Sequence, residues 1–180
     1  MGLERLFQRA PGIEPVGAFD GVRGLFAVLE RERVDVVVLD YDLGSGDGLA
    51  ACARVKQLAS RPAVVIYSGY AGPQLTLAAR VAQADAVIDK AEPVEVLLDA
   101  ISRLAGGERL LGRPAADLVE AAGARLSVDD LPVMALLIDR ATTLEIADTL
   151  NLDEREAVRR SQRVVGVVQQ GCRARGATPR

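Results

Sequence analysis

A chain of 180 residues with 49% hydrophobic and 26% charged residues has the composition of a folded soluble protein, with room for one full domain and a second small one. It contains no histidine and no glycine-rich phosphate loop, and its two cysteines, Cys52 and Cys172, lie far apart, so we expect no enzyme, zinc site or disulfide. The net charge is −3, no stretch approaches the roughly 18 apolar residues of a membrane span, and no signal peptide opens the chain, so we expect a cytoplasmic protein without a membrane partner.

Short apolar runs alternate with longer helical patterns from residue 11 to about residue 105, which is typical of a parallel α/β sheet. Pro15 should place the first strand at a sheet edge, because proline lacks a backbone N–H. We therefore predict an α/β domain over residues 1–105. Its expected strands are 13–18, 34–40, 63–67 and 86–88, and its expected helices are 20–32, 49–58, 73–82 and 93–104.

Polar side chains stand where three successive predicted strands end. Four apolar residues, 36–39, predict a strand buried on both faces, and Asp40 follows them at the rim where open α/β sheets place their chemistry. Ser68 and Lys90 end the next two strands. The three side chains should therefore converge on one rim of the sheet.

The segment Leu39-Asp-Tyr-Asp-Leu-Gly-Ser-Gly-Asp-Gly-Leu49, taken with Ser68 and Lys90, resembles the phosphoacceptor site of response-regulator receiver domains. The resemblance covers residues 2–112 and implies a flavodoxin-like fold. It implies that Asp40 accepts a phosphoryl group from a sensor histidine kinase, with Ser68 and Lys90 contacting the phosphoryl oxygens. It also implies Mg²⁺, with Asp40 and the backbone carbonyl of Asp42 among its ligands.

The sequence departs from the receiver pattern at its start. Residues 2–13 match only the end of the first helix of that pattern, so the first strand and the acidic pair that holds Mg²⁺ have no counterpart. Asp40 with one carbonyl is a poor Mg²⁺ site, because Mg²⁺ needs several oxygen ligands. Two interpretations stay open: the start was placed too far downstream, or the protein is a pseudo-receiver. Val87 and Gly44 replace an aromatic residue and a proline of the pattern, so any switch should be altered.

Glycines and Pro114 predict a linker over 106–125, followed by a small all-α domain over 126–170 and a flexible tail over 171–180. Ser127 and Asp130 offer a capping box. Because Pro132 suits a first turn, we expect the first helix to start near residue 131, with Asp130 as its cap. The next helices should cover 143–150 and 154–168.

Segments 126–137 and 142–152 resemble the helix-turn-helix output domain of NarL/LuxR-type regulators, most clearly at Glu145-Ile-Ala147. The resemblance implies a homodimer whose third helix lies in the DNA major groove. The side chains that would face DNA are Arg155, Arg159, Arg160 and Arg163. Alternatively these arginines form only a solvated face, and Glu154 and Glu156 oppose the approach of phosphate.

The sequence therefore predicts a transcriptional response regulator, in which a phosphoryl-accepting receiver controls DNA binding by a C-terminal helix-turn-helix. The alternative is a phosphorylation-independent pseudo-receiver that acts as a protein-interaction or ligand-binding module.

Overall fold

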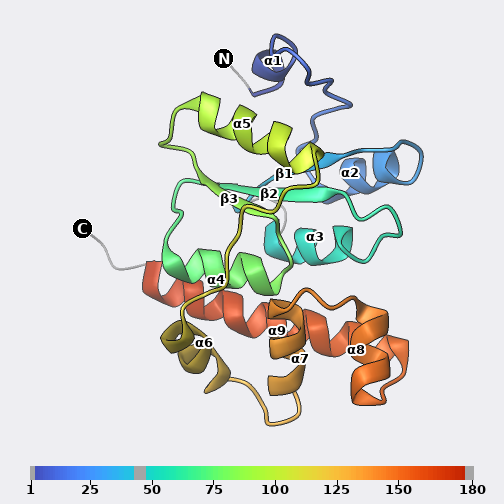
Figure 1. Cartoon of the computed structure of the whole chain (residues 1–180), viewed down its shortest axis with the longest axis vertical. Coiled ribbons are helices and arrows are strands. Elements are labelled where there is room, and N and C mark those ends of the chain that lie inside the picture. Colours follow the sequence, from blue (N-terminus) through green and yellow to red (C-terminus); the bar gives the residue numbers. More distant parts are fainter. Residues whose placement is uncertain (1–2, 43–47, 177–180) are drawn as a thin grey trace.

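The computed structural model describes residues 3–42 and 48–176, and its elements form an α/β half, residues 3–105, and a helical half, residues 116–176 (Figure 1). The α/β half contains α1 (Leu3–Phe7), α2 (Val22–Leu29), β1 (Val36–Asp40), α3 (Gly48–Val55), β2 (Ala63–Ser68), α4 (Pro73–Val81), β3 (Ala86–Asp89) and α5 (Val94–Ala105). The helical half contains α6 (Ala116–Gly123), α7 (Leu131–Ile138), α8 (Thr143–Leu150) and α9 (Glu154–Gly176). The predicted fold class, a parallel α/β unit followed by a small all-α unit, is confirmed.

The three strands are parallel and lie in the order β1-β2-β3, with α5 on one face and α3 and α4 on the other (Figure 1). The sheet is buried on both sides because its strand residues alternate between two cores. Val36 and Val38 pack with the residues of α5, and Val37 and Leu39 pack with those of α3 and α4. This double burial explains the unbroken apolar run that marked β1 in the sequence.

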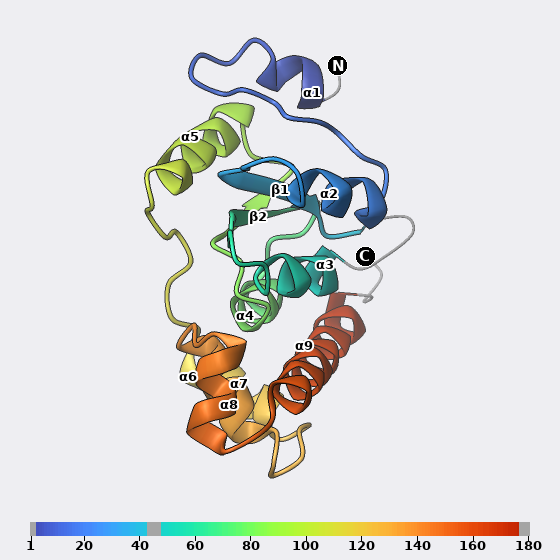
Figure 2. The same cartoon turned by 90° about the vertical axis from the view of Figure 1, so that its right-hand side faces the viewer.

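The predicted edge strand over residues 13–18 is wrong. This segment has no regular structure and runs past β1 without joining the sheet (Figure 2). A strand needs a neighbour to take its backbone hydrogen bonds, and Pro15 has no N–H to give. The apolar alternation of residues 13–18 suits a strand. Within the described residues, however, no strand lies beside this segment to form backbone hydrogen bonds with it.

Gly48 brings the start of α3 against the end of β1. A Cβ atom at this position would collide with the backbone carbonyl of Asp40, and the Gly48 N–H donates to the Tyr41 carbonyl at 3.3 Å. Only glycine permits so close an approach of two backbones. The loop before it, residues 43–47, contains Gly44 of the sequence pattern and lies outside the described residues.

The helical half differs from expectation in two places. Part of the predicted linker is α6, whose Leu118, Val119 and Ala122 pack on the core. The third helix, expected to end near residue 168, continues to Gly176 and so covers part of the predicted tail. Gly166 and Gly171 lie inside this helix, where packing overrides their low helix propensity.

The two halves share one hydrophobic core. Helix α9 contacts α3 and α4 as well as α7 and α8, and Figure 1 shows it between α4 and the other helices of the helical half. Its Val164, Val165 and Val168 are buried in the same cluster as residues of α3 and α4. No helix of the described chain is long and apolar enough to cross a membrane.

Candidate functional site

Asp40 and Lys90 meet at the carboxyl end of the sheet. Asp40 is the last residue of β1, and Lys90 directly follows β3, two strands away. The Lys90 ammonium donates to Asp40 Oδ2 with an Nζ–Oδ2 distance of 2.5 Å, and both side chains are about 40% exposed. Two of the three predicted site residues thus form a solvent-accessible ion pair.

The other oxygen of Asp40 is also engaged. Oδ1 accepts a hydrogen bond from the Asp42 backbone N–H at 3.0 Å, a contact that holds the chain in a turn after β1. The Asp42 side chain is exposed. A negative charge arriving beside Asp40 would therefore meet one ammonium and one backbone N–H, both donors.

Ser68 is the third predicted residue, and it lies at the end of β2 between the strands that carry the other two. Its side chain is 3% exposed, and its hydroxyl is used within its own turn. Oγ donates to the Tyr70 carbonyl at 3.0 Å and accepts from the Tyr70 N–H at 3.1 Å. A role for Ser68 toward a phosphoryl group stays a prediction.

The residues around Asp40 do not by themselves make a Mg²⁺ site. Among the described residues, no group of three or more acidic, cysteine or histidine side chains is placed to hold a metal. Asp40 and Asp42 supply two carboxylates, and both oxygens of Asp40 already accept hydrogen bonds. Because Mg²⁺ takes six oxygen ligands in near-octahedral geometry, these groups are too few.

The arginines predicted to contact DNA lie on the N-terminal part of α9. Arg155, Arg159 and Arg163 repeat at four-residue spacing and are all exposed, so they form one stripe along the helix. Arg160 is partly buried. We call Arg155, Arg159 and Arg163 the basic stripe. The buried face of α9 points the other way, toward the core that the two halves share.

Most of these arginines are held by carboxylates. Glu156 accepts from Arg159 at 2.7 Å and from Arg160 at 2.8 Å, and these hydrogen bonds hold its pKa below the ordinary value of a glutamate. Among the described residues Arg155 has no ion pair. Glu156, which the sequence suggested would oppose DNA, therefore neutralises part of the positive face and positions the side chains of Arg159 and Arg160.

Asp130 holds the third arginine of the stripe. Both Asp130 oxygens accept from Arg163 at 2.8 Å, although we expected this carboxylate to cap α7, which begins at Leu131 as predicted. The Asp130 side chain makes no capping hydrogen bond, and the capping box forms instead between Thr142 and Glu145 at the start of α8. The Arg163 hydrogen bonds hold the pKa of buried Asp130 below its usual range.

This lowered pKa predicts a specific loss of stability in acid. The contribution of Asp130 is complete above the unfolded-state pKa of about 4 and disappears as the pH falls through the lower pKa of the folded state. Urea unfolding between pH 6 and pH 3 should show a smaller loss of stability for Asp130→Asn than for the unaltered protein. Asp129→Asn, a neighbouring exposed position, is the matched control and should keep the original pH dependence. Identical profiles for Asp130→Asn and the unaltered protein would contradict this assignment.

A buried charge cluster that the sequence did not reveal joins the two halves. Asp85, just before β3, accepts from Lys56 in the α/β half. It also accepts from Nη1 of Arg140, which follows α7, at 2.8 Å. Its Oδ2 also accepts from the Val64 N–H at 2.8 Å. Arg140 donates further to the Ala84 carbonyl at 3.0 Å. We call Lys56, Asp85 and Arg140 the buried triad.

Comparisons with known proteins agree with this architecture. The family model of the response regulator receiver domain matches residues 1–102. The probable transcriptional regulatory protein SgaR of Hyphomicrobium methylovorum is 26% identical over 147 residues, which are 81% of this chain and 70% of that protein.

Two structures of the response regulator RcsB from Salmonella enterica serovar Typhimurium, each bound to a promoter in the presence of phosphomimetic BeF3⁻, have TM-scores of 0.52 and 0.56. They are 19% and 17% identical to this chain, and each comparison covers 92% of this chain and 84% of RcsB. At this level of identity the likeness is one of fold, and it extends over both halves.

Proposed function

Because the chain belongs to the response regulator receiver family, we propose that it is a transcriptional response regulator in which Asp40 receives a phosphoryl group and α9 contacts DNA. The observation that carries the proposal is the Asp40–Lys90 pair at the carboxyl end of a parallel sheet, in a chain whose second half exposes a basic stripe. The proposed phosphoryl donor is a sensor histidine kinase.

In the proposed reaction, a carboxylate oxygen of Asp40 attacks the phosphorus of a phosphohistidine on the kinase. The new O–P bond forms while the N–P bond breaks, and the imidazole keeps the electron pair of that bond. The ammonium of Lys90 offsets the charge of the added phosphoryl group. The hydroxyl of Ser68 could hydrogen-bond a phosphoryl oxygen only after releasing the Tyr70 carbonyl, to which it now donates.

Receiver domains generally bind Mg²⁺, which neutralises charge during phosphoryl transfer. The two carboxylates near the end of β1 are too few to complete the coordination of Mg²⁺. The proposed reaction therefore includes no step that depends on the ion. We therefore expect slow phosphorylation, in which Asp40 supplies the nucleophile and Lys90 neutralises the charge of the phosphoryl group.

A phosphorylation assay tests this proposal directly. Incubation with acetyl phosphate and Mg²⁺ should add the mass of one phosphoryl group to the intact protein, and Asp40→Asn should add none because the amide cannot act as the nucleophile. Asp42→Asn is the matched control, because it also changes an acidic side chain after β1 but leaves the proposed nucleophile in place. Two results would show that Asp40 is not the phosphoryl acceptor: a phosphoryl adduct on the Asp40→Asn variant, or no adduct on the unaltered protein.

The second candidate function is a pseudo-receiver that acts without phosphorylation. Two observations favour it. Among the described residues no third carboxylate joins Asp40 and Asp42, and the Asp40 charge is already neutralised by Lys90 without a phosphoryl group. In that case Asp40→Asn would leave expression of the regulated genes unchanged. A salt titration of DNA binding separates a regulator from a protein-interaction module, because phosphate contacts weaken steeply as salt rises.

DNA binding is proposed for the basic stripe. Arginine suits this surface because its planar guanidinium can contact either phosphate oxygens or the edge of guanine. A homodimer would present two stripes to paired half-sites. RcsB has been solved as two dimers bound to two parallel DNAs, which supports proposing the same kind of assembly here.

A further inference from the structure

Arg125 lies across helix α9 at Gly171. A side chain at Gly171 would collide with Nη1 of Arg125, so the guanidinium occupies the space that this glycine leaves open. Gly171 is inside α9, where glycine has a lower helix propensity than nearly every other residue. Its place in the helix therefore has a reason other than helix formation, and room for Arg125 supplies one.

The main chain around Arg125 is fixed. Arg125 lies between α6 and α7, and its N–H donates to the Ala122 carbonyl at 3.1 Å. The next residue, Leu126, donates its N–H to the Gly123 carbonyl at 2.9 Å and packs on the shared core. Arg125 itself is exposed, and within the part of the chain that the structure describes its side chain forms no ion pair or hydrogen bond. A positioned cation is therefore available to an anion.

Gly171 lies in the same row of α9 as the basic stripe. Residues four apart in a helix follow one another along a row inclined to the helix axis. This row contains Arg155, Arg159, Arg163, Val167 and Gly171. Since Arg125 covers Gly171, it supplies a fourth arginine beyond the C-terminal end of the stripe. The four arginines, which we call the arginine row, span about 24 Å along the axis, because a helix rises roughly 1.5 Å per residue.

The uncompensated charge of the arginine row lies at its two ends. Glu156 and Asp130 already offset the charges of the two middle arginines. Arg155 and Arg125, at the ends, have no ion pair among the described residues. The major groove of B-DNA is about 12 Å wide, so a row about twice as long extends past the base edges and can reach phosphate oxygens at its ends.

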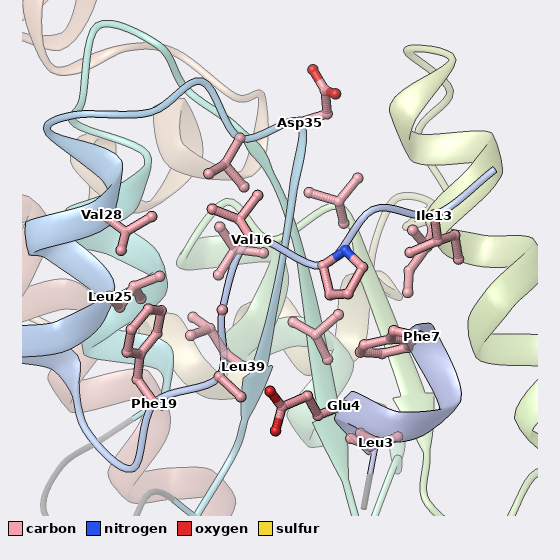
Figure 3. A pocket seen from close by; sticks show the side chains of 18 of the residues that line it. Leu3, Glu4, Phe7, Ile13, Val16, Phe19, Leu25, Val28, Asp35 and Leu39 are labelled. Carbon is pink, nitrogen blue, oxygen red and sulfur yellow. The ribbon is translucent and has the colours of Figure 1, made fainter. Parts of the chain in front are cut away.

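A cavity in the α/β half does not suit such an anion. It has a volume of about 540 Å³ and lies beside β1 (Figure 3). Its lining includes more carboxylates than cations, and the side chains labelled in Figure 3 are apolar except for Glu4 and Asp35. This cavity would repel a DNA backbone, so the arginine row is the better surface for phosphate.

We propose that Arg125 binds a phosphate of the DNA backbone and that Gly171 is a positioning residue, which keeps open the space that the Arg125 guanidinium needs. This role rests on the proposed function, because it adds a contact from outside α9 to the DNA surface proposed there. Phosphate contacts orient a protein on DNA but carry no sequence information directly. Arg125 therefore contributes the same affinity on every DNA sequence.

Arg125→Ala tests the phosphate contact in the full chain. A fluorescent duplex of about 30 base pairs and arbitrary sequence serves as the probe, because phosphate contacts supply nearly all of the affinity for non-specific DNA. Loss of one contact should lower the slope of log affinity against log salt by about 0.9, which is roughly an eightfold loss of affinity at 0.1 M salt. Fluorescence anisotropy should show the same loss on a second duplex of unrelated sequence.

Two further variants serve as controls. Arg125→Lys keeps the positive charge and should retain most of the salt slope. Arg109→Ala removes an exposed arginine from the segment before α6 and should leave both the affinity and the slope unchanged. Because the two alanine variants change the net charge by the same amount, a difference between them locates the contact at Arg125.

Gly171→Ala tests the positioning role without changing any charge. Its methyl group displaces the Arg125 guanidinium, so DNA binding should weaken about threefold or more. Alanine has the higher helix propensity, so the substitution should not destabilise α9. In the Arg125→Ala background the same substitution should have no further effect on DNA binding, because the two side chains then no longer compete for space.

Three results would each overturn a different claim. If Arg125→Ala and Arg109→Ala bind DNA with the same affinity and salt slope, Arg125 contacts no phosphate, even if its loss lowers the melting temperature. The proposed function would still stand in that case, provided that Arg155→Ala weakens binding. A further loss from Gly171→Ala in the Arg125→Ala background would remove the positioning role. No binding of either duplex by the unaltered protein at about 50 mM salt would overturn the proposed DNA-binding function itself.

Discussion

Replacing Arg155 and Arg159 together by glutamate is expected to weaken DNA binding about 100-fold or more. Each arginine that contacts DNA is worth about 1–3 kcal/mol, and reversing the charge adds repulsion from phosphate. Both side chains lie on the exposed face of α9, so the change should leave the fold intact. Fluorescence anisotropy with a labelled DNA fragment, measured at several salt concentrations, gives the affinity and its salt dependence.

A matched double variant separates the basic stripe from overall charge. Arg23→Glu with Arg31→Glu makes the same change in net charge at exposed positions of the α/β half. It should weaken DNA binding only slightly and leave the slope of affinity against salt unchanged. Equal losses in the two double variants would mean that α9 has no special role, and the proposed DNA surface would have to be abandoned.

Asp85→Ala should lower the free energy of unfolding by about 3–5 kcal/mol, the usual cost of removing one partner from a buried ion pair. Lys56 and Arg140 have side chains only 9% and 10% exposed, so the variant leaves two buried cations without their carboxylate. The Val64 N–H also loses its acceptor. Urea unfolding followed by circular dichroism measures the change.

Asp99→Ala provides the comparison, because Asp99 forms an ion pair with Arg103 at the surface, where its side chain is 65% exposed. Exposed pairs contribute little, so this variant should change stability by well under 1 kcal/mol. A loss below about 1 kcal/mol for Asp85→Ala would mean that water or rearrangement replaces the carboxylate, and that the buried triad does not hold the two halves together.

The parts of the site that the sequence predicted are those that depend on local pattern. An apolar run ending in Asp40 marked a buried strand and its rim, and Lys90 followed the last strand in the same way. Their meeting in space follows from the parallel order of the strands, which the alternation of strands and helices had already indicated. The position of Ser68 at the end of its strand was also predictable. Its hydrogen bonds to the Tyr70 backbone were not, because they depend on the conformation of the turn after the strand.

The buried triad was not predictable in this way, because its members come from three segments that are far apart in the sequence. Nothing in the local pattern around Asp85 distinguishes it from a surface aspartate that precedes a strand. The strand expected over residues 13–18 failed for a related reason. Its alternation suits a sheet, but a strand forms only beside a neighbour, and the described residues supply none.

Ser161 is a polar residue on the buried face of α9. It is 6% exposed, and its Oγ has no hydrogen bond among the described residues. A cavity of about 20 Å³ lies beside it, between α9 and the α/β half. A buried hydroxyl without a hydrogen bond lowers the free energy of unfolding, and this one lies at the contact between the two halves.

Helix α9 also has a mechanical consequence. It is one unbroken helix of 23 residues, about 35 Å long, whose far portion lies under α4 while its beginning carries the basic stripe (Figure 1). A continuous helix is stiff along its axis, so a displacement of its C-terminal part by α4 would also displace the arginines at its start. Such a movement would not require α9 to unfold.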